Sequence, residues 1–252
     1  MTVRPSLARG ARSRLTRLDE ILEALYQTPE ESLGNKPDPL DEVVYIILSF
    51  QTDLARFSAT WARLRRAYPT WAMLDRASES SIARVLREGG LQRQKARTLK
   101  QLFAAVKDAT GTLSLDALRG MDTEAAEAML LRLPGLSWKG ARCVLLYSLG
   151  REAFPVDSNV FRVLKRIGVV PRRAVYRRRS LHDKLQELVP PARRRALHIN
   201  LVVHGQRTCL PRAPRCGDCA ARPICAMAGV RRRWDERRGG DEVADGTLAN
   251  AR

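Results

Sequence analysis

The sequence lacks any run of about twenty apolar residues, so we expect no membrane-spanning helix. Its first eighteen residues, MTVRPSLARGARSRLTRL, are basic but contain no apolar secretion-signal core. We therefore expect a reducing, cytoplasmic location, on the nucleoid if the host is bacterial. Lysines are few beside arginines, which makes each lysine worth inspecting. No segment sustains a two-residue alternation of apolar and polar residues, which argues against β-strands.

The 252 residues are enough for one large domain or two small ones. A hydrophobic content of 44% can form a core and argues against disorder throughout the chain. The formal net charge is +18, and the pI is about 10.7. Such an excess of positive charge indicates a polyanionic partner, most often nucleic acid. A solvated basic surface is the plainer alternative.

Apolar residues recur at helical spacing along most of the chain, which predicts an all-α protein. The apolar run DEVVYIILSF has the composition of a buried strand. It continues into helically spaced residues, however, so we expect two buried helices joined near Gln51. Other helices are predicted around Leu18 to Leu25 and over about 80–88, 92–109, 113–118, 122–132, 138–149, 158–167, 180–189 and 193–204. Few apolar residues follow Cys225, which predicts a disordered tail over 229–252.

Four of the five cysteines lie in one short segment, CLPRAPRCGDCAARPIC. They are Cys209, Cys216, Cys219 and Cys225. In a reducing compartment such clusters are more often metal ligands than disulfides. Tetrahedral zinc and a [4Fe–4S] cluster are both compatible with four thiolates. Only one pair is closely spaced, which favours the bulkier cluster. The fifth, Cys143, lies on an apolar helix face and is expected to be buried as a small hydrophobic residue.

The stretch LPGLSWKGA, residues 133–141, predicts a tight turn leading into a helix. With the helix before it, this turn forms a helix–hairpin–helix. The backbone N–H groups at such a helix start can hold a phosphate oxygen without reading base sequence. The helix terminus and Arg142 should both lower the pKa of Lys139, as a lysine nucleophile requires. An isolated lysine would ordinarily be a solvated surface residue.

These motifs resemble those of the endonuclease III family of DNA glycosylases. The resemblance rests on the cysteine spacing with its lead-in HGQRTC, on the hairpin, and on FPVDSNVFRV, residues 154–163. It implies that Lys139 and Asp157 are catalytic and that the four cysteines bind a [4Fe–4S] cluster. Taken alone, Asp157 would be an ordinary helix N-cap. The family usually has glycine where Ser137 stands, and many members have histidine where Asn159 stands.

The resemblance also implies residues that contact DNA. A glycosylase must flip the target nucleotide out of the duplex. The motifs LSFQ and GLQRQKA imply that Gln51 fills the vacated space and that Leu91 wedges the opposite strand. Core packing is the alternative for Leu91. Further contacts are expected from Gly135, Ser137, Arg142, Arg212, Arg215 and Arg222.

The resemblance covers roughly residues 18–228 and implies two all-α lobes. We expect a basic flexible arm over 1–17, a six-helix domain over 31–151, and a cluster domain formed by 18–30 plus 152–228. The implied activity is that of a monomeric, bifunctional glycosylase and AP lyase, which removes oxidised pyrimidines from duplex DNA and cuts the strand by β-elimination. Two alternatives stay open. One is a cluster-bearing DNA-binding paralogue with little turnover, and the other is a zinc-stapled nucleic-acid binder.

Overall fold

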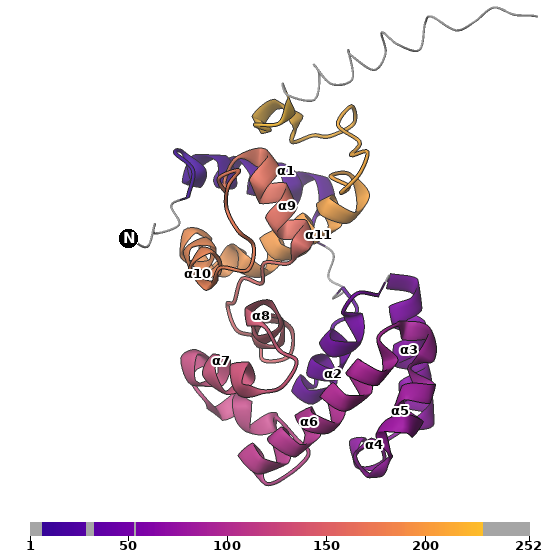
Figure 1. The fold of residues 1–252 in the computed structure, drawn as a ribbon. Helices are drawn as coiled ribbons and strands as arrows, with labels where there is room; N and C mark the ends of the chain where they lie inside the picture. Colours follow the sequence, from indigo (N-terminus) through magenta and orange to yellow (C-terminus); the bar gives the residue numbers. More distant parts are fainter. Residues whose placement is uncertain (1–6, 29–32, 53, 229–252) are drawn as a thin grey trace, which may run out of the picture. The chain divides into compact units, whose positions relative to one another are not determined.

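The computed structural model describes residues 7–28, 33–52 and 54–228, and it consists of helices joined by loops (Figure 1). These residues contain no β-strand, so the predicted all-α class is confirmed. None of their helices is long and apolar enough to cross a membrane. The described chain divides into two compact units. Unit 1 contains residues 7–28, 156–188 and 196–228, and unit 2 contains the remainder.

Unit 2 is built around a buried helix, α2 (Pro39–Ser49), which contacts α3, α6 and α8 (Figure 1). Asp38 caps this helix by accepting a hydrogen bond from the Asp41 N–H, and Pro39 occupies its first position. The apolar run is therefore a helix buried on most sides, as expected. The other helices of the unit are α3 (Leu54–Ala67), α4 (Trp71–Arg76), α5 (Glu79–Val85), α6 (Gln92–Thr110), α7 (Thr123–Arg132) and α8 (Trp138–Tyr147).

Two local predictions in unit 2 were wrong. The helix α4 was missed, because it has only six residues and its apolar pattern is too short to show a period. Tertiary packing supports it, since Trp71 donates a hydrogen bond from Nε1 to Asp41 Oδ1 at 2.7 Å and packs against the tilted ring of Phe103. The helix expected over 113–118 is instead a 3₁₀ turn, η2 (Asp116–Gly120). Two further 3₁₀ turns are η1 (Arg87–Gly89) and η3 (Pro191–Arg193).

Unit 1 contains α1 (Ala11–Tyr26), α9 (Ser158–Ile167), α10 (Arg179–Leu188), most of α11 (Arg194–Arg207) and the 3₁₀ turn η4 (Arg222–Ile224). The predicted flexible arm was wrong for residues 11–17, which begin α1 and bury Ala11 and Leu15. Residues 1–6 and the predicted tail, 229–252, lie outside the described residues. The bounds of the units also differ from the predicted domains, because 152–155 and 189–195 group with unit 2.

Candidate functional site

The predicted hairpin is formed by α7, a turn and α8, and these two helices pack against each other. Ser137 caps α8, since its hydroxyl accepts a hydrogen bond from the Gly140 N–H at 3.5 Å. Its φ of −108° lies in the extended region, which any residue adopts. The position therefore has no conformational need for glycine, and serine supplies a cap that glycine would lack.

Gly135, in contrast, needs to be glycine. Its φ is +85°, in the left-handed region. A Cβ at this position would lie 2.6 Å from Thr98 Cγ2 and 3.2 Å from the Ile47 side chain. The turn thus packs directly on α6 and α2, and this close approach fixes where α8 begins.

We expect Gly135→Ala to destabilise unit 2 by about 2–5 kcal/mol. The left-handed conformation costs an alanine roughly 1–2 kcal/mol, and the overlap with Thr98 adds about 1–3 kcal/mol. Urea unfolding measures the loss. Gly120→Ala is the control, because a Cβ there meets nothing within 4 Å. Adding Thr98→Ser removes the overlapping methyl group, so it should restore only the part of the unfolding free energy that was lost to that overlap. A double variant no more stable than Gly135→Ala would contradict the packing argument.

Lys139 lies in the first turn of α8 and is partly exposed. It lies within electrostatic reach of Glu42, a carboxyl group of α2 that is fully buried. Burial raises the pKa of Glu42 to about 7, although hydrogen bonds from Lys36 N–H and the Asn35 amide, and the charge of Lys139, act in the opposite direction. A carboxyl group that titrates near neutrality therefore lies beside the predicted nucleophile.

Sequence reasoning missed Glu42. The signal was an acidic residue at the start of an otherwise apolar run, but no local pattern connects it with a lysine almost a hundred positions later. Only the packing of α2 against α8 brings these two segments together.

The prediction that Arg142 contacts DNA was wrong. Its side chain is buried, with 2% of the residue exposed, and its Nε donates to Glu127 Oε1 at 2.9 Å. This ion pair joins α8 to α7 inside the hairpin.

Asp157 is the N-cap of α9, and both of its carboxylate oxygens are hydrogen-bonded. Oδ1 accepts from the Val160 N–H at 2.7 Å, and Oδ2 accepts from the Asn159 side-chain amide at 3.0 Å. Asn159 is held in turn by Arg162, whose Nη2 donates to Asn159 Oδ1 at 2.9 Å. Asn159, which stands where many members of the resembled family have histidine, therefore orients the carboxylate of Asp157.

Arg162 connects this carboxylate to the cysteine segment. Its Nη2 also donates to Gly205 O at 2.7 Å, and its Nε donates to Cys209 O at 2.9 Å. A single guanidinium thus fixes both the Asn159 amide and the start of the cysteine loop, so the position of that loop and the orientation of Asp157 depend on each other.

Gln51 and Leu91 occupy two turns of unit 2. Both have positive φ, +52° and +49°, which is uncommon for residues other than glycine. Both are exposed, Leu91 by 39%. The core-packing alternative for Leu91 is therefore wrong, and both side chains are free to meet a partner.

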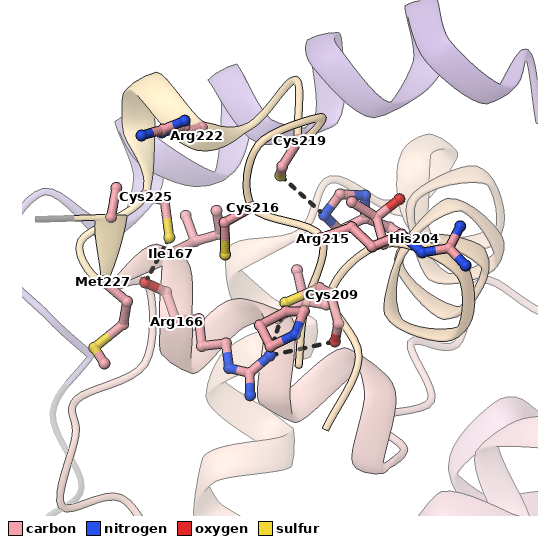
Figure 2. Close-up of a pocket in the computed structure, with 14 residues that line it drawn as sticks. Arg166, Ile167, His204, Cys209, Arg215, Cys216, Cys219, Arg222, Cys225 and Met227 are labelled. Atoms are coloured by element: carbon pink, nitrogen blue, oxygen red, sulfur yellow. Dashed lines mark hydrogen bonds between the residues drawn. The ribbon is translucent and has the colours of Figure 1, made fainter. Parts of the chain in front are cut away.

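The four clustered cysteines line one pocket (Figure 2). Around them, Arg166 donates from Nη1 to Cys209 Sγ at 3.3 Å, and Cys225 Sγ donates to Arg166 O at 3.4 Å. His204 Nε2 lies 3.7 Å from Cys219 Sγ. Within the described residues, no three His, Cys, Asp or Glu side chains are grouped closely enough to hold a metal ion.

The chemistry of the pocket fits a cationic metal centre. Burial raises the pKa values of Cys219 and Cys225, and the nearby thiolates of the other cysteines raise them further. Four thiolates in one pocket repel each other unless a cation compensates their charge. Cys143, as predicted, is buried in α8 and does not line this pocket.

The three arginines of the cysteine segment, Arg212, Arg215 and Arg222, are all exposed. The loop that carries them is ordered by backbone hydrogen bonds, among them Arg215 N–H to Thr208 O at 2.9 Å. Their charges are therefore presented to solvent from a defined loop.

Comparison with known proteins decides the family. Residues 44–191, more than half of the chain, match the family described as HhH-GPD superfamily base excision DNA repair protein. The chain belongs to this superfamily. The HhH-GPD match includes both the hairpin with Lys139 and the α9 N-cap, Asp157.

Among its relatives, this HhH-GPD chain is 32% identical over 184 residues to "Putative DNA glycosylase At3g47830" of Arabidopsis thaliana, covering 73% of this chain and 60% of that protein. The matched region thus spans less than two thirds of that relative. It is 29% identical over 192 residues to Endonuclease III of Escherichia coli strain K12, covering 76% and 85% of the two chains. A non-covalent Endonuclease III–DNA complex shares its fold, with a TM-score of 0.76, 22% identity and coverage of 88% and 98%. The resemblance to endonuclease III is confirmed.

Proposed function

We propose that this chain is a base-excision-repair DNA glycosylase that also has AP lyase activity. It would remove oxidised pyrimidines from duplex DNA and then cut the abasic strand by β-elimination. The observation that carries the proposal is the presentation of Lys139, a partly exposed amine in the first turn of the hairpin's second helix, within an HhH-GPD chain. We further propose that the protein acts as a monomer.

In the proposed reaction, the damaged nucleotide is flipped out of the duplex. The neutral amine of Lys139 forms a bond to C1′ of the deoxyribose while the bond from C1′ to the base breaks, and the base leaves with a proton. The sugar ring opens to a Schiff base between Lys139 and C1′. Loss of a proton from C2′ then expels the 3′ phosphate, and water releases the lysine.

Asp157 would stabilise the positive charge that develops on the sugar as the base departs. This role is supported by the two hydrogen bonds that fix its carboxylate, one from the Val160 N–H and one from Asn159. A carboxylate held in this way needs no reorganisation during the reaction. The proposal requires Lys139 and Asp157 to act on the same deoxyribose, although they belong to different units.

The proposed grip on DNA involves backbone and side-chain contacts. The hairpin turn at Gly135 and Ser137 would hold a phosphate through its N–H groups. Gln51 and Leu91 would enter the base stack. The exposed loop arginines, Arg212, Arg215 and Arg222, would neutralise phosphates, which makes binding salt-dependent.

We also propose that Cys209, Cys216, Cys219 and Cys225 hold a [4Fe–4S] cluster. Two observations support this: the four thiols line one pocket, and each thiolate raises the pKa of its neighbours. The bound cluster would supply the cross-link that keeps the arginine loop folded. A single zinc ion is the alternative occupant.

A panel of duplexes, each with one defined lesion, tests the function. We expect release of thymine glycol and cleavage of an abasic strand, without action on undamaged DNA or on adenine opposite oxidised guanine. The upstream fragment should end in the 3′ unsaturated aldehyde of β-elimination and the downstream fragment in a 5′ phosphate, and mass spectrometry identifies both. Tight duplex binding with no base release and no cleavage would contradict the proposal and favour the DNA-binding paralogue.

A further inference from the structure

Lys95 is a charged side chain that no motif had assigned a role. It is 3% exposed, although it lies near the start of α6 beside exposed residues. Its Nζ donates three hydrogen bonds, to Leu48 O at 2.8 Å, to Thr52 Oγ1 at 2.7 Å and to Gly89 O at 2.8 Å. An ammonium has three donors, and here each has an acceptor.

The three acceptors come from two separate segments. Leu48 lies at the end of α2 and Thr52 in the turn that follows it, whereas Gly89 ends η1. The Thr52 hydroxyl also donates to Gly89 O at 2.7 Å, which closes a small network. Burial lowers the pKa of Lys95, because removing the charged ammonium from water costs free energy. The three oxygen acceptors offset part of that cost.

This network lies directly behind the two predicted DNA-probing residues. Gln51 immediately precedes Thr52, and Leu91 follows Gly89 by two residues. Both have left-handed backbone conformations, which persist only where the surroundings enforce them. Phe50, 37% exposed, belongs to the same turn as Gln51.

We propose that Lys95 is a positioning residue whose ammonium ties the Gln51 turn to the Leu91 turn, so that both side chains enter the duplex at a fixed separation. The inference rests on the proposed function. It adds to that function that one buried cation, Lys95, keeps the two turns that carry Gln51 and Leu91 rigid. Lys95 itself touches no DNA in this scheme, because its three donors are all used within the protein.

The test compares variants that break the network at different points. Lys95→Met keeps the side-chain length and removes the ammonium. Thr52→Val removes the bridging hydroxyl, and Thr52→Ser retains it as the conservative rescue. Lys107→Met is the matched control on the same helix, since its Nζ pairs with Asp75 Oδ2 at 2.8 Å and is partly exposed.

Three measurements are made on each folded variant. Hydrogen exchange of the free protein should quicken in peptides containing Gln51 and Leu91 for Lys95→Met and Thr52→Val only. Cleavage of an abasic site in duplex DNA should fall by roughly 10–100-fold, the scale on which a small misplacement acts. Covalent trapping on single-stranded abasic DNA should not change, since no base stack has to be entered there.

The outcomes separate this inference from the proposed function. If wild-type protein fails to cut abasic DNA, the proposed function is wrong. The connection that Lys95 makes between the two turns can then still be tested by hydrogen exchange and by the fluorescence of 2-aminopurine opposite the abasic site. If Lys95→Met leaves both turns protected, or weakens single-stranded trapping as much as duplex cleavage, Lys95 does not position the turns. Should Lys95→Met not fold, the pair Thr52→Val and Thr52→Ser decides the question by the same readings.

Discussion

Lys139→Met is expected to abolish the covalent complex that the wild-type chain forms with abasic DNA in the presence of borohydride. Borohydride traps the protein by reducing a Schiff base, and methionine offers no amine to form one. Strand cleavage should fall by roughly 10³-fold or more, as when an enzyme loses a covalent nucleophile. Because the side-chain length is kept, affinity for undamaged duplex should stay close to that of the wild type.

Lys107→Met is the control for this experiment, because Lys107 is an exposed lysine of the same unit and pairs with Asp75. It should be trapped as efficiently as the wild type. If Lys139→Met is still trapped in full, another amine is the nucleophile, and the assignment of Lys139 fails. Trapping that is lost together with duplex binding would indicate a folding defect instead, which circular dichroism distinguishes.

Cys216→Ala is expected to give protein without the brown colour and visible absorbance of an iron–sulfur cluster. Wild-type protein purified anaerobically should contain about four iron atoms and four sulfides per chain. The variant should bind little iron, because the remaining thiolates cannot enclose the cluster. The 209–225 loop should then become sensitive to proteases, and unit 1 should unfold at lower temperature, since binding of the metal centre stabilises the fold.

The matched control is Cys143→Ala, which removes a buried thiol of unit 2 that does not line the pocket. It should retain the full iron content and lose only the stability expected of a small core change. Colourless wild-type protein with a single zinc ion would overturn the cluster assignment while leaving the four cysteines as ligands. Full iron content in Cys216→Ala would exclude Cys216 from the ligand set.

The sequence predicted what depends on local patterns. The period of the apolar residues gave the long helices, and the spacing of the cysteines gave a group of side chains that lines one pocket. The N-cap role of Asp157 followed from its place before an apolar stripe, and the structure has this cap.

Features that depend on a distant partner were not predictable. The Arg142 side chain is buried because it pairs with Glu127 on the neighbouring helix, α7. No residue close to Arg142 in the sequence indicates this pairing. The role of Lys95 was not predictable either, because its three acceptors come together only when the two turns are folded. Only the backbone conformation shows why serine can replace glycine at position 137, because that conformation is an ordinary extended one.

The capping role of Asp157 has a consequence for how such a protein could change over generations. Asparagine caps helices about as well as aspartate, so the cap of α9 alone does not require an acid. An asparagine at this position would, however, turn an N–H donor toward the Asn159 amide group, whose oxygen is already held by Arg162. The hydrogen-bond network therefore favours the acid at this position even in a descendant that no longer turns over.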